Sequence, residues 1–488
     1  MKKKMRVGKL TSSEPMKVAR WLLDNRYFSM ESASRSSLVD VGGGLWQFEG
    51  NRWVKKRDDW LVNDLRLALE DLNVRVGVDA DTGEETYARF ASGTGTYDRK
   101  VKDVAKCVGG LVRVENVRMP FWRNPVPRDL DARFCVAFPN VILEIGRDGV
   151  QSVPMTDRFV TRSTMPVDYD PAAKCPLWMK CLGEWSGGDA DFEEVLQRWW
   201  GYMLLPYRGH ATWMYMYGKV RAGKGLQMRL AKHVLGGFPA FQAVSLEDLG
   251  GDYGLDGLQD ASVLGISELD DMDTRVGNRA AMEMKRMLGG DDQRINPKYG
   301  KTIHDGKCDP AIWVCGNKIL RVSNTGEGLS SKMVPLWFKQ SFVGKTDLTL
   351  EDRLKEQGEL SGVLRWAVEG AMKLQQATPE NRWPVGEGSQ EVLRLFKLYN
   401  NPLEQFLDSM FVQDAEGFVR SKRIQSMWTE FCRTNKLKYH VAANQLMIRM
   451  QQETSWNVYR LGKRVGQRTY PGMQGLSVKK RDHVDEHI

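Results

Sequence analysis

The sequence predicts an α/β fold, and three observations carry that prediction. Apolar runs of strand length alternate with amphipathic segments of helix length through the middle of the chain. A glycine-rich loop stands between one of these runs and the helix that follows it. The 488 residues are 42% hydrophobic and 27% charged, which is typical of a folded chain with a large core. At about 150 residues per domain, this length corresponds to about three domains.

Residues 1–165 are expected to form an N-terminal α+β domain. Residues 43–62 predict a hairpin that leads into a helix, because Glu49-Gly50-Asn51 separates two runs that contain aromatic residues. Short apolar runs between residues 133 and 165 predict further strands. The segment shows no clustered metal-binding carboxylates, so no primase activity is expected of it.

Residues 166–208 are expected to form a helical collar region. Trp178, Leu182 and Trp185 recur at the spacing of one helix face, and the aromatic stripe at 196–203 continues the pattern in a second helix. We interpret both stripes as core packing.

Residues 209–376 are expected to form the α/β domain itself. The apolar runs at 211–217, 261–266 and 311–315 predict strands, and the region from 349 to 374 predicts a long helical stretch.

A phosphate-binding loop follows the first of these strands. Its glycines allow successive backbone N–H groups to surround phosphate oxygens, and the next helix adds its positive N-terminus and a lysine ammonium. The loop matches GxxxxGK, and the residues expected to bind the nucleotide are Gly218, Lys219, Val220, Arg221, Ala222, Gly223, Lys224 and Gly225. Strand, loop and helix in this order are the context that the motif requires. The sequence therefore predicts a site for the phosphates of a nucleotide.

One position departs from the usual pattern of such loops. Gly225 stands where a serine or threonine normally binds Mg²⁺, so carboxylates elsewhere must hold the ion. Glu268 and Asp270 follow the strand at 261–266 and are expected to serve as metal ligands, with Glu268 also polarising water. The alternative for these two residues is an ordinary acidic loop. Asn317 follows the third strand and is expected to sense the γ-phosphate or orient the attacking water.

The C-terminal part of the chain is basic. Residues 377–390 are expected to be a linker, and residues 391–488 a compact module. Within it, helices are predicted at 391–410, 420–435 and 441–452, and strand-like alternation at 456–470. Residues 421–488 hold thirteen Lys and Arg against five Asp and Glu, which is most of the chain's net charge of +9. This distribution favours contact with nucleic acid, and the alternatives are a solubilising tail or a protein-interaction wing.

Other counts narrow the class of protein. Seven scattered cysteines form no CxxC pair, which argues against a zinc site and for reduced thiols. No apolar run reaches the length of a membrane span, and no apolar segment follows the basic start of the chain, Met1-Lys2-Lys3-Lys4. A cytoplasmic protein without a membrane partner is expected.

Several further segments, in their order along the chain, carry a family resemblance. They are 166–172, 196–205, 252–258, 287–299 and 341–374. Together with the phosphate loop they resemble superfamily III helicases, in particular the phage and plasmid primase-helicase family related to poxvirus-type replicative ATPases. The resemblance implies an AAA+-like P-loop ATPase core, an N-terminal α+β and helical region, and a C-terminal winged-helix-like domain.

The resemblance also implies roles for single residues. Lys224 would contact the phosphates, Glu268 would be the acidic-motif carboxylate and Asn317 the sensor. Lys298, or else Lys301, would touch the nucleic-acid backbone from a hairpin in the ring channel.

The family acts as a ring, usually a hexamer, with ATP between neighbouring subunits. Lys332 stands where the neighbour's catalytic arginine is expected, and it supplies a point charge without the bidentate fork. Arg321 is the alternative for this role. In the winged-helix-like domain, Arg460, Lys463 and Arg464 would contact DNA phosphates.

The expected function is therefore an ATP-dependent, ring-forming DNA helicase of a phage or mobile element. Its expected partners are single-stranded and forked DNA, further copies of the chain and other replication proteins, and its cofactors ATP and Mg²⁺. The alternative is a replication initiator or loader that binds ATP as a switch and hydrolyses it weakly. A DNA-packaging motor is less favoured, because no nuclease module is evident.

Overall fold

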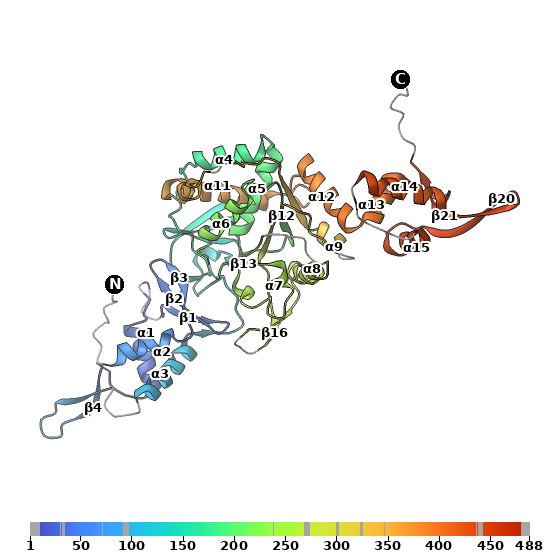
Figure 1. Cartoon of the computed structure of the whole chain (residues 1–488). Helices are drawn as coiled ribbons and strands as arrows, with labels where there is room; N and C mark the ends of the chain where they lie inside the picture. Colours follow the sequence, from blue (N-terminus) through green and yellow to red (C-terminus); the bar gives the residue numbers. More distant parts are fainter. Residues whose placement is uncertain are drawn as a thin grey trace.

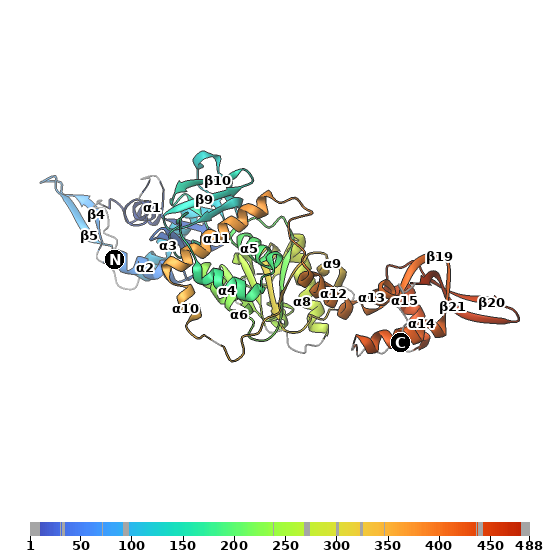
Figure 2. The ribbon, with the colours of Figure 1, turned by 90° about the horizontal axis from the view of Figure 1, so that it is seen from above.

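The computed structural model describes residues 10–29, 31, 35–70, 72–90, 97–237, 239–267, 274–298, 302–322, 326–345, 347–435, 437 and 443–479. It is a mixed α/β structure with several separate sheets, one of them parallel. The N-terminal helices and the C-terminal module lie at opposite ends of a central body (Figure 1, Figure 2). Within the described residues, no helix is both long and apolar enough to cross a membrane.

The N-terminal part combines helices with small sheets. Three helices pack around one hydrophobic core: α1 (Pro15–Asn25), α2 (Trp60–Leu69) and α3 (Tyr97–Val112). A four-stranded sheet has the order β3-β2-β1-β6, with β1 (Leu38–Val41), β2 (Gly44–Glu49), β3 (Arg52–Lys55) and β6 (Arg113–Val114). β4 (Asn73–Val78) and β5 (Glu85–Arg89) form a separate hairpin. The predicted hairpin at 43–62 is confirmed as β2, β3 and the start of α2.

Smaller sheets connect this part to the central body. β8 (Cys135–Ala137), β9 (Val141–Gly146) and β10 (Gly149–Pro154) form one antiparallel sheet, and β7 (Phe121–Trp122) pairs with β11 (Phe159–Val160). Two short 3₁₀ turns, Pro127–Asp129 and Ala132–Phe134, precede β8. These strands confirm the prediction made for residues 133–165.

The two aromatic stripes form the predicted collar helices, α4 (Pro176–Ser186) and α5 (Ala190–Leu204). Asp189 caps α5, because its side chain accepts a hydrogen bond from the backbone N–H of Phe192. α5 packs along α11 (Gln357–Gln376) so closely that a Cβ on Gly201 would stand 2.1 Å from the backbone nitrogen of Ala371. The short helix α10 (Leu350–Leu354) precedes α11, and the two account for the helical stretch predicted at 349–374.

A five-stranded parallel sheet forms the centre of the molecule, in the order β13-β14-β17-β12-β18. Its strands are β12 (Trp213–Gly218), β13 (Phe241–Val244), β14 (Val263–Ile266), β17 (Ala311–Gly316) and β18 (Met333–Phe338). The three apolar runs are confirmed as β12, β14 and β17. β13 and β18 were not predicted from the sequence. β18 contains Pro335, which is tolerated because β18 is an edge strand and pairs only with β12.

Helices cover both faces of this sheet. Along β12, Trp213 and Tyr215 pack on one face while Met214 and Met216 pack on the other. The face of Met214 carries α6 (Lys224–Val234) together with α4, α5 and α11. The opposite face carries α7 (Leu246–Leu249), α8 (Thr274–Gly289) and α12 (Glu387–Asn400). The hairpin β15 (Gln293–Ile295) and β16 (Ile303–Gly306) follows α8, and the short helix α9 (Gly326–Ser330) precedes β18.

The C-terminal module has a hydrophobic core of its own. Its elements are α13 (Pro402–Met410), β19 (Phe411–Arg420), α14 (Ser421–Thr434), α15 (Ala443–Glu453), β20 (Tyr459–Val465) and β21 (Arg468–Val478). The antiparallel sheet has the order β19-β21-β20, and β20 with its half of β21 projects beyond the helices (Figure 1, Figure 2).

The helix predicted at 391–410 was wrong as a single helix. It is divided into α12 and α13 at Asn401-Pro402, because Pro402 has no N–H to continue the ladder and takes the first position of a new helix. Phe396 of α12 packs against Trp213 and Tyr215 of the central sheet, with ring centroids 6.2 and 6.4 Å apart. The hydrophobic core therefore changes within the last turn of α12, where Phe396 belongs to the central core and Leu398 to that of the C-terminal module. The sequence placed the start of this module at residue 391.

Candidate functional site

The predicted phosphate loop lies between β12 and α6, at the carboxyl edge of the parallel sheet. Two glycines are required by its geometry. Gly218 has φ 150°, and a Cβ there would stand 2.1 Å from the carbonyl oxygen of Phe338. Gly223 has φ 97°, and its Cβ would stand 2.5 Å from Nε1 of Trp185. The motif glycines thus let β18 and α4 approach the loop closely.

The segment after β18 holds the loop from the other side. The N–H of Lys219 donates to the carbonyl of Phe338 at 3.2 Å, and the N–H of Phe342 donates to the carbonyl of Arg221 at 3.0 Å. The hydroxyl of Ser341 donates to the carbonyl of Val220 at 2.9 Å. These bonds fix the loop although Arg221 itself has a positive φ of 54°.

Lys224 turns its side chain back over this loop. Its Nζ donates to the carbonyls of Gly218 and Lys219, at 2.8 and 2.5 Å. Burial lowers the pKa of Lys224 below the ordinary lysine value. The ammonium is therefore incompletely solvated, and its hydrogen-bond acceptors among the described residues are neutral carbonyls, an arrangement that favours an incoming anion.

Gly225 lies in the first turn of α6 with room for a side chain. A Cβ there would meet only Nη1 of Arg229, at 3.2 Å, and this is the end of a flexible side chain that pairs with Glu351. The backbone at position 225 would thus accept a serine or threonine, so the fold does not require the absence of a Mg²⁺-binding hydroxyl there.

The expected carboxylates follow β14, which ends at Ile266. Glu268 and Asp270 lie outside the described residues, so their geometry stays a prediction. Within the ranges that the structure does describe, no three His, Cys, Asp or Glu side chains are grouped to hold a metal ion.

Asn317 lies next to the phosphate loop. β17 pairs with β12 in a register that sets Gly316 opposite Tyr217, so Asn317 follows the end of β17 beside Gly218, the last residue of β12. Cys315, the penultimate residue of β17, points its thiol at the carbonyl of Lys224 at 4.0 Å. The structure therefore places Asn317 beside the start of the loop and Lys224 over the loop.

Lys332 is not brought to this site within the chain. It precedes β18 at the amino edge of the sheet, where its carbonyl accepts from the N–H of Trp213 at the start of β12. Its Nζ donates to the carbonyl of Leu288 at 3.4 Å. Arg321 lies after β17, and its guanidinium stacks 5.5 Å from the ring centre of Tyr399.

The expected nucleic-acid contacts lie on two hairpins. Lys298 is exposed between β15 and β16, and its backbone N–H donates to Asp256 at 3.2 Å. Lys301 lies outside the described residues. Arg460, Lys463 and Arg464 are all exposed on β20.

On β20 these cations divide between the two faces of the ribbon, since neighbouring side chains point to opposite faces. Arg460 and Arg464 share one face. Lys463 lies on the other, with its Nζ 5.7 Å from the ring centre of Phe418.

Sequence reasoning missed two supports of the loop. Trp185 was interpreted only as core, and no periodicity could show that the same indole also touches Gly223. The segment 341–374 was noted for its family resemblance, but the hydrogen bonds of Phe338, Ser341 and Phe342 to the loop depend on the unpredicted strand β18.

Comparison with solved structures finds a similar fold in the C-terminal region of NrS-1. An A-form apo structure of that region gives a TM-score of 0.51 at 10% sequence identity, covering 89% of this chain and 94% of that chain. A second A-form apo structure of the same region gives a TM-score of 0.51 at 10% identity, covering 95% of this chain and 100% of that chain. At this identity the likeness concerns the fold alone. No family model matches the chain, and no curated protein matches it in sequence.

Proposed function

We propose that the chain is an ATP-driven, AAA+-like P-loop motor that acts as a DNA helicase in the replication of a phage or other mobile genetic element. The observation that carries the proposal is the loop before α6. Lys224 lies over it, and Asn317 leaves the sheet beside it.

The order of the strands supports a nucleotide site at this place. From β12 the chain builds β13, β14 and β17 on one side of β12, and then crosses to form β18 on its other side. Ligands of open parallel sheets bind outside the carboxyl ends of the strands, where such a reversal occurs. The loop at 218–223 lies at that point.

The residues of the loop fit a nucleoside triphosphate. The N-terminus of α6 and the loop N–H groups would bind phosphate oxygens, and the ammonium of Lys224 would exchange its two carbonyl partners for the β- and γ-phosphates. Asn317 would orient the attacking water. Mg²⁺ would neutralise charge on the phosphates, and in this proposal Glu268 and Asp270 hold it in place of the missing hydroxyl at Gly225.

The C-terminal module supports the part of the proposal that concerns DNA. Its order of α13, β19, α14, α15 and the β20–β21 ribbon is compatible with a winged-helix-like domain, in which α15 would be the recognition helix and the ribbon the wing. Arg460, Lys463 and Arg464 are exposed on that ribbon and would contact phosphates.

The position of Lys332 supports a ring. A cation at the amino edge of the sheet is separated from its own loop by the length of β12, about 20 Å for a six-residue strand. It can assist hydrolysis only at a neighbour's nucleotide. We therefore include a homo-oligomer, a hexamer by resemblance, together with other replication proteins as partners.

Lys224→Ala tests the proposal, with Lys232→Ala as a matched control. Lys232 is an exposed lysine in the last turn of the same helix. We expect Lys224→Ala to abolish both ATPase activity and displacement of a strand from forked DNA, while Lys232→Ala keeps both. ATP hydrolysis by the wild type that does not respond to single-stranded DNA would contradict the helicase proposal.

A second candidate is an ATP-switched initiator or loader that hydrolyses ATP weakly. Gly225 favours it, because the helix leaves room for a hydroxyl that the sequence does not supply. Lys332 favours it as well, since a lysine replaces the forked guanidinium. ATP-dependent assembly on forked DNA without strand displacement would identify this function.

A further inference from the structure

Two adjoining cavities lie at the opposite end of α6 from the phosphate loop. Their volumes are about 550 and 630 Å³, and both are lined by Arg162, Ser163 and Leu235. Leu235 directly follows α6, whose eleven residues separate it from Lys224 by about 16 Å. The cavities are therefore distinct from the ATP site and lie between the N-terminal sheets and the amino edge of the central sheet.

Arg162 stands in the wall that the two cavities share, with 15% of its side chain exposed. Its nearest carboxylate is Asp260, whose Oδ1 is 3.7 Å from Nε, and the other oxygen of Asp260 is 2.5 Å from Nζ of Lys55. Among the described residues the guanidinium has no hydrogen-bond acceptor, and its Nε is fully buried. A buried guanidinium with its donors unused is costly, and an anion in the cavity would satisfy it.

Two further arginines face the first cavity. In the part of the chain that the structure describes, Arg208 donates to neutral carbonyls, including that of Ser262 at 2.8 Å, and its buried Nε has no acceptor there. Arg118 pairs with Asp309 at 3.2 Å. Burial lowers the pKa of Arg162 and of Arg208, so their surroundings compensate these charges incompletely.

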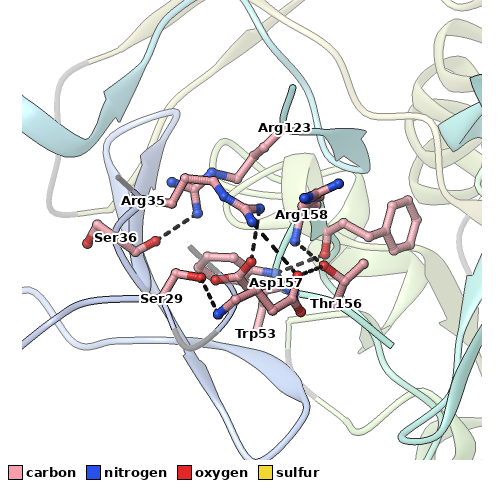
Figure 3. A network of polar contacts seen from close by, with 10 residues as sticks. Ser29, Arg35, Ser36, Trp53, Arg123, Thr156, Asp157 and Arg158 are labelled. Atoms are coloured by element: carbon pink, nitrogen blue, oxygen red, sulfur yellow. Dashed lines mark hydrogen bonds and ion pairs between the residues drawn. The ribbon is translucent and has the colours of Figure 1, made fainter. Parts of the chain in front are cut away.

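The second cavity continues the positive surface and adds aromatic walls. Arg52 and Lys55 line it from β3, and Trp46 and Trp53 form part of its wall. Trp53 is held in place, because its Nε1 donates to the carbonyl of Phe159 at 2.9 Å beneath a network of arginines and acidic side chains (Figure 3).

That network fixes the wall to the strand that leads to Arg162. Arg35 donates to Asp157 at 3.2 Å, and Arg123 donates to the carbonyl of Ser36 at 2.8 Å (Figure 3). The segment 156–160 therefore joins the N-terminal sheet to the cavity without depending on a ligand, and the cavity is a built feature of the fold.

We propose that the two cavities form a binding groove for phosphate groups, centred on Arg162, and that the phosphates belong to a single strand of nucleic acid. Successive cations from Arg118 and Arg208 through Arg162 to Lys55 and Arg52 follow the groove across both chambers. A strand presents phosphates at intervals along such a path, whereas a free phosphate or polyphosphate needs only one of the chambers. The proposal does not rest on ATP hydrolysis.

Binding measured without ATP, in the full-length chain, tests the groove. A Lys224→Ala background removes phosphate binding at the loop. In that background, Arg162→Gln is compared with Arg394→Gln, an arginine paired with Glu391 on the surface of α12. Arg52→Glu is the second test variant, because Arg52 is exposed and its replacement should leave folding intact.

The probes are a fluorescent single-stranded oligothymidine, followed by anisotropy, and inorganic tripolyphosphate, followed by thermal shift. We expect Arg162→Gln and Arg52→Glu each to weaken oligothymidine binding roughly tenfold, and to lower the salt dependence by about one phosphate contact. Arg394→Gln should bind oligothymidine as tightly as the Lys224→Ala background does. Because Arg162→Gln also removes the ion pair with Asp260, thermal unfolding of the free variant separates any loss of stability from the loss of binding.

Two results would overturn the proposal. If tripolyphosphate stabilises the protein through Arg162 while oligothymidine binding is unchanged, the groove binds a free polyphosphate and not a strand. If neither probe responds to Arg162 or Arg52, the cavities bind no phosphate group. Both results are independent of whether the chain hydrolyses ATP.

Discussion

Gly223 of the phosphate loop lies directly against Trp185 of α4, at a distance that leaves no room for a Cβ between the two. Helix α4 thereby contacts the predicted phosphate loop. The aromatic stripe is therefore more than a core, because one of its indoles packs against the loop.

Gly223→Ala should therefore disturb the loop more than the addition of a single methyl group implies. The new Cβ would stand 2.5 Å from Nε1 of Trp185, and the alanine would have to adopt a φ of 97°. Such a conformation costs about 1–3 kcal/mol, and we expect at least that loss in the free energy of unfolding together with weaker nucleotide binding. Gly225→Ala is the matched control, since its Cβ meets only the flexible end of Arg229. Denaturant unfolding and nucleotide titration measure both effects, and equal behaviour of the two variants would contradict the role of Trp185.

Gly225→Ser should restore the usual Mg²⁺ ligand of such loops. The helix has space for the side chain. We therefore expect the Mg²⁺ concentration needed for nucleotide binding to fall about fivefold, which corresponds to about 1 kcal/mol. Titration of Mg²⁺ at fixed nucleotide measures the change, and Gly225→Ala separates the hydroxyl from the methylene. An unchanged Mg²⁺ requirement would show that other groups already complete the coordination.

Mixing two inactive variants tests whether Lys332 acts on a neighbour. Lys332→Ala keeps its phosphate loop and Lys224→Ala keeps its Lys332, so a mixed ring contains some interfaces in which both residues are intact. We expect each variant to lose ATPase activity and the mixture to regain part of it. A mixture as inactive as its components would place the role of Lys332 elsewhere, and Arg321→Ala would then be the next variant to mix.

The position at which the C-terminal module is removed should matter. A chain that ends at Asn400 keeps α12 on the sheet, so it should bind nucleotide normally and lose duplex DNA affinity. A chain that ends at residue 390 also loses Val392 and Phe396 from the core. Removal of a buried phenylalanine side chain alone costs about 3–5 kcal/mol. Thermal unfolding distinguishes the two, and equal stability would show that α12 belongs with the C-terminal module.

His210 should make the folded state sensitive to acid. Burial, with the charges of Arg382 and Arg208, lowers its pKa to about 4. Between that value and about 6.5 the unfolded chain binds a proton that the folded chain does not, so stability is present near neutrality and falls as the pH is lowered through this range. We expect a shallower slope between about pH 6.5 and 4 in His210→Gln than in the wild type, measured by denaturant unfolding at several pH values. Parallel profiles for the two proteins would show that His210 does not contribute.

The parts of the fold that the sequence predicts are those with local signals. β12, β14 and β17 are continuous apolar runs, as buried parallel strands are, and the loop at 218–223 has a spacing imposed by phosphate geometry. β18 was not predicted from the sequence, because Pro335 argues against a strand unless the strand is known to lie at the edge of the sheet. The break at Pro402 was readable from the sequence, since proline begins helices and rarely lies within them.

The cavity around Arg162 had no comparable signal. Arg162 is separated along the chain from Arg52, Arg118 and Arg208, and only tertiary packing brings the four to one surface. Single arginines at wide spacing resemble an ordinary solvated surface in a sequence. Within the described part of the chain, the Nε atoms of Arg162 and Arg208 have no hydrogen-bond acceptor, and this becomes visible only when the side chains are placed.

Helix α6 begins at the phosphate loop and ends in the wall of the groove, so one rigid element carries both surfaces. The hydroxyl of Ser163 also bonds the carbonyl of Leu235 at that end, at 3.0 Å. Any tilt of α6 that distinguishes two states of the loop must also reshape the groove. By thermodynamic reciprocity, the factor by which nucleotide changes the affinity for a strand is then the factor by which the strand changes the affinity for nucleotide.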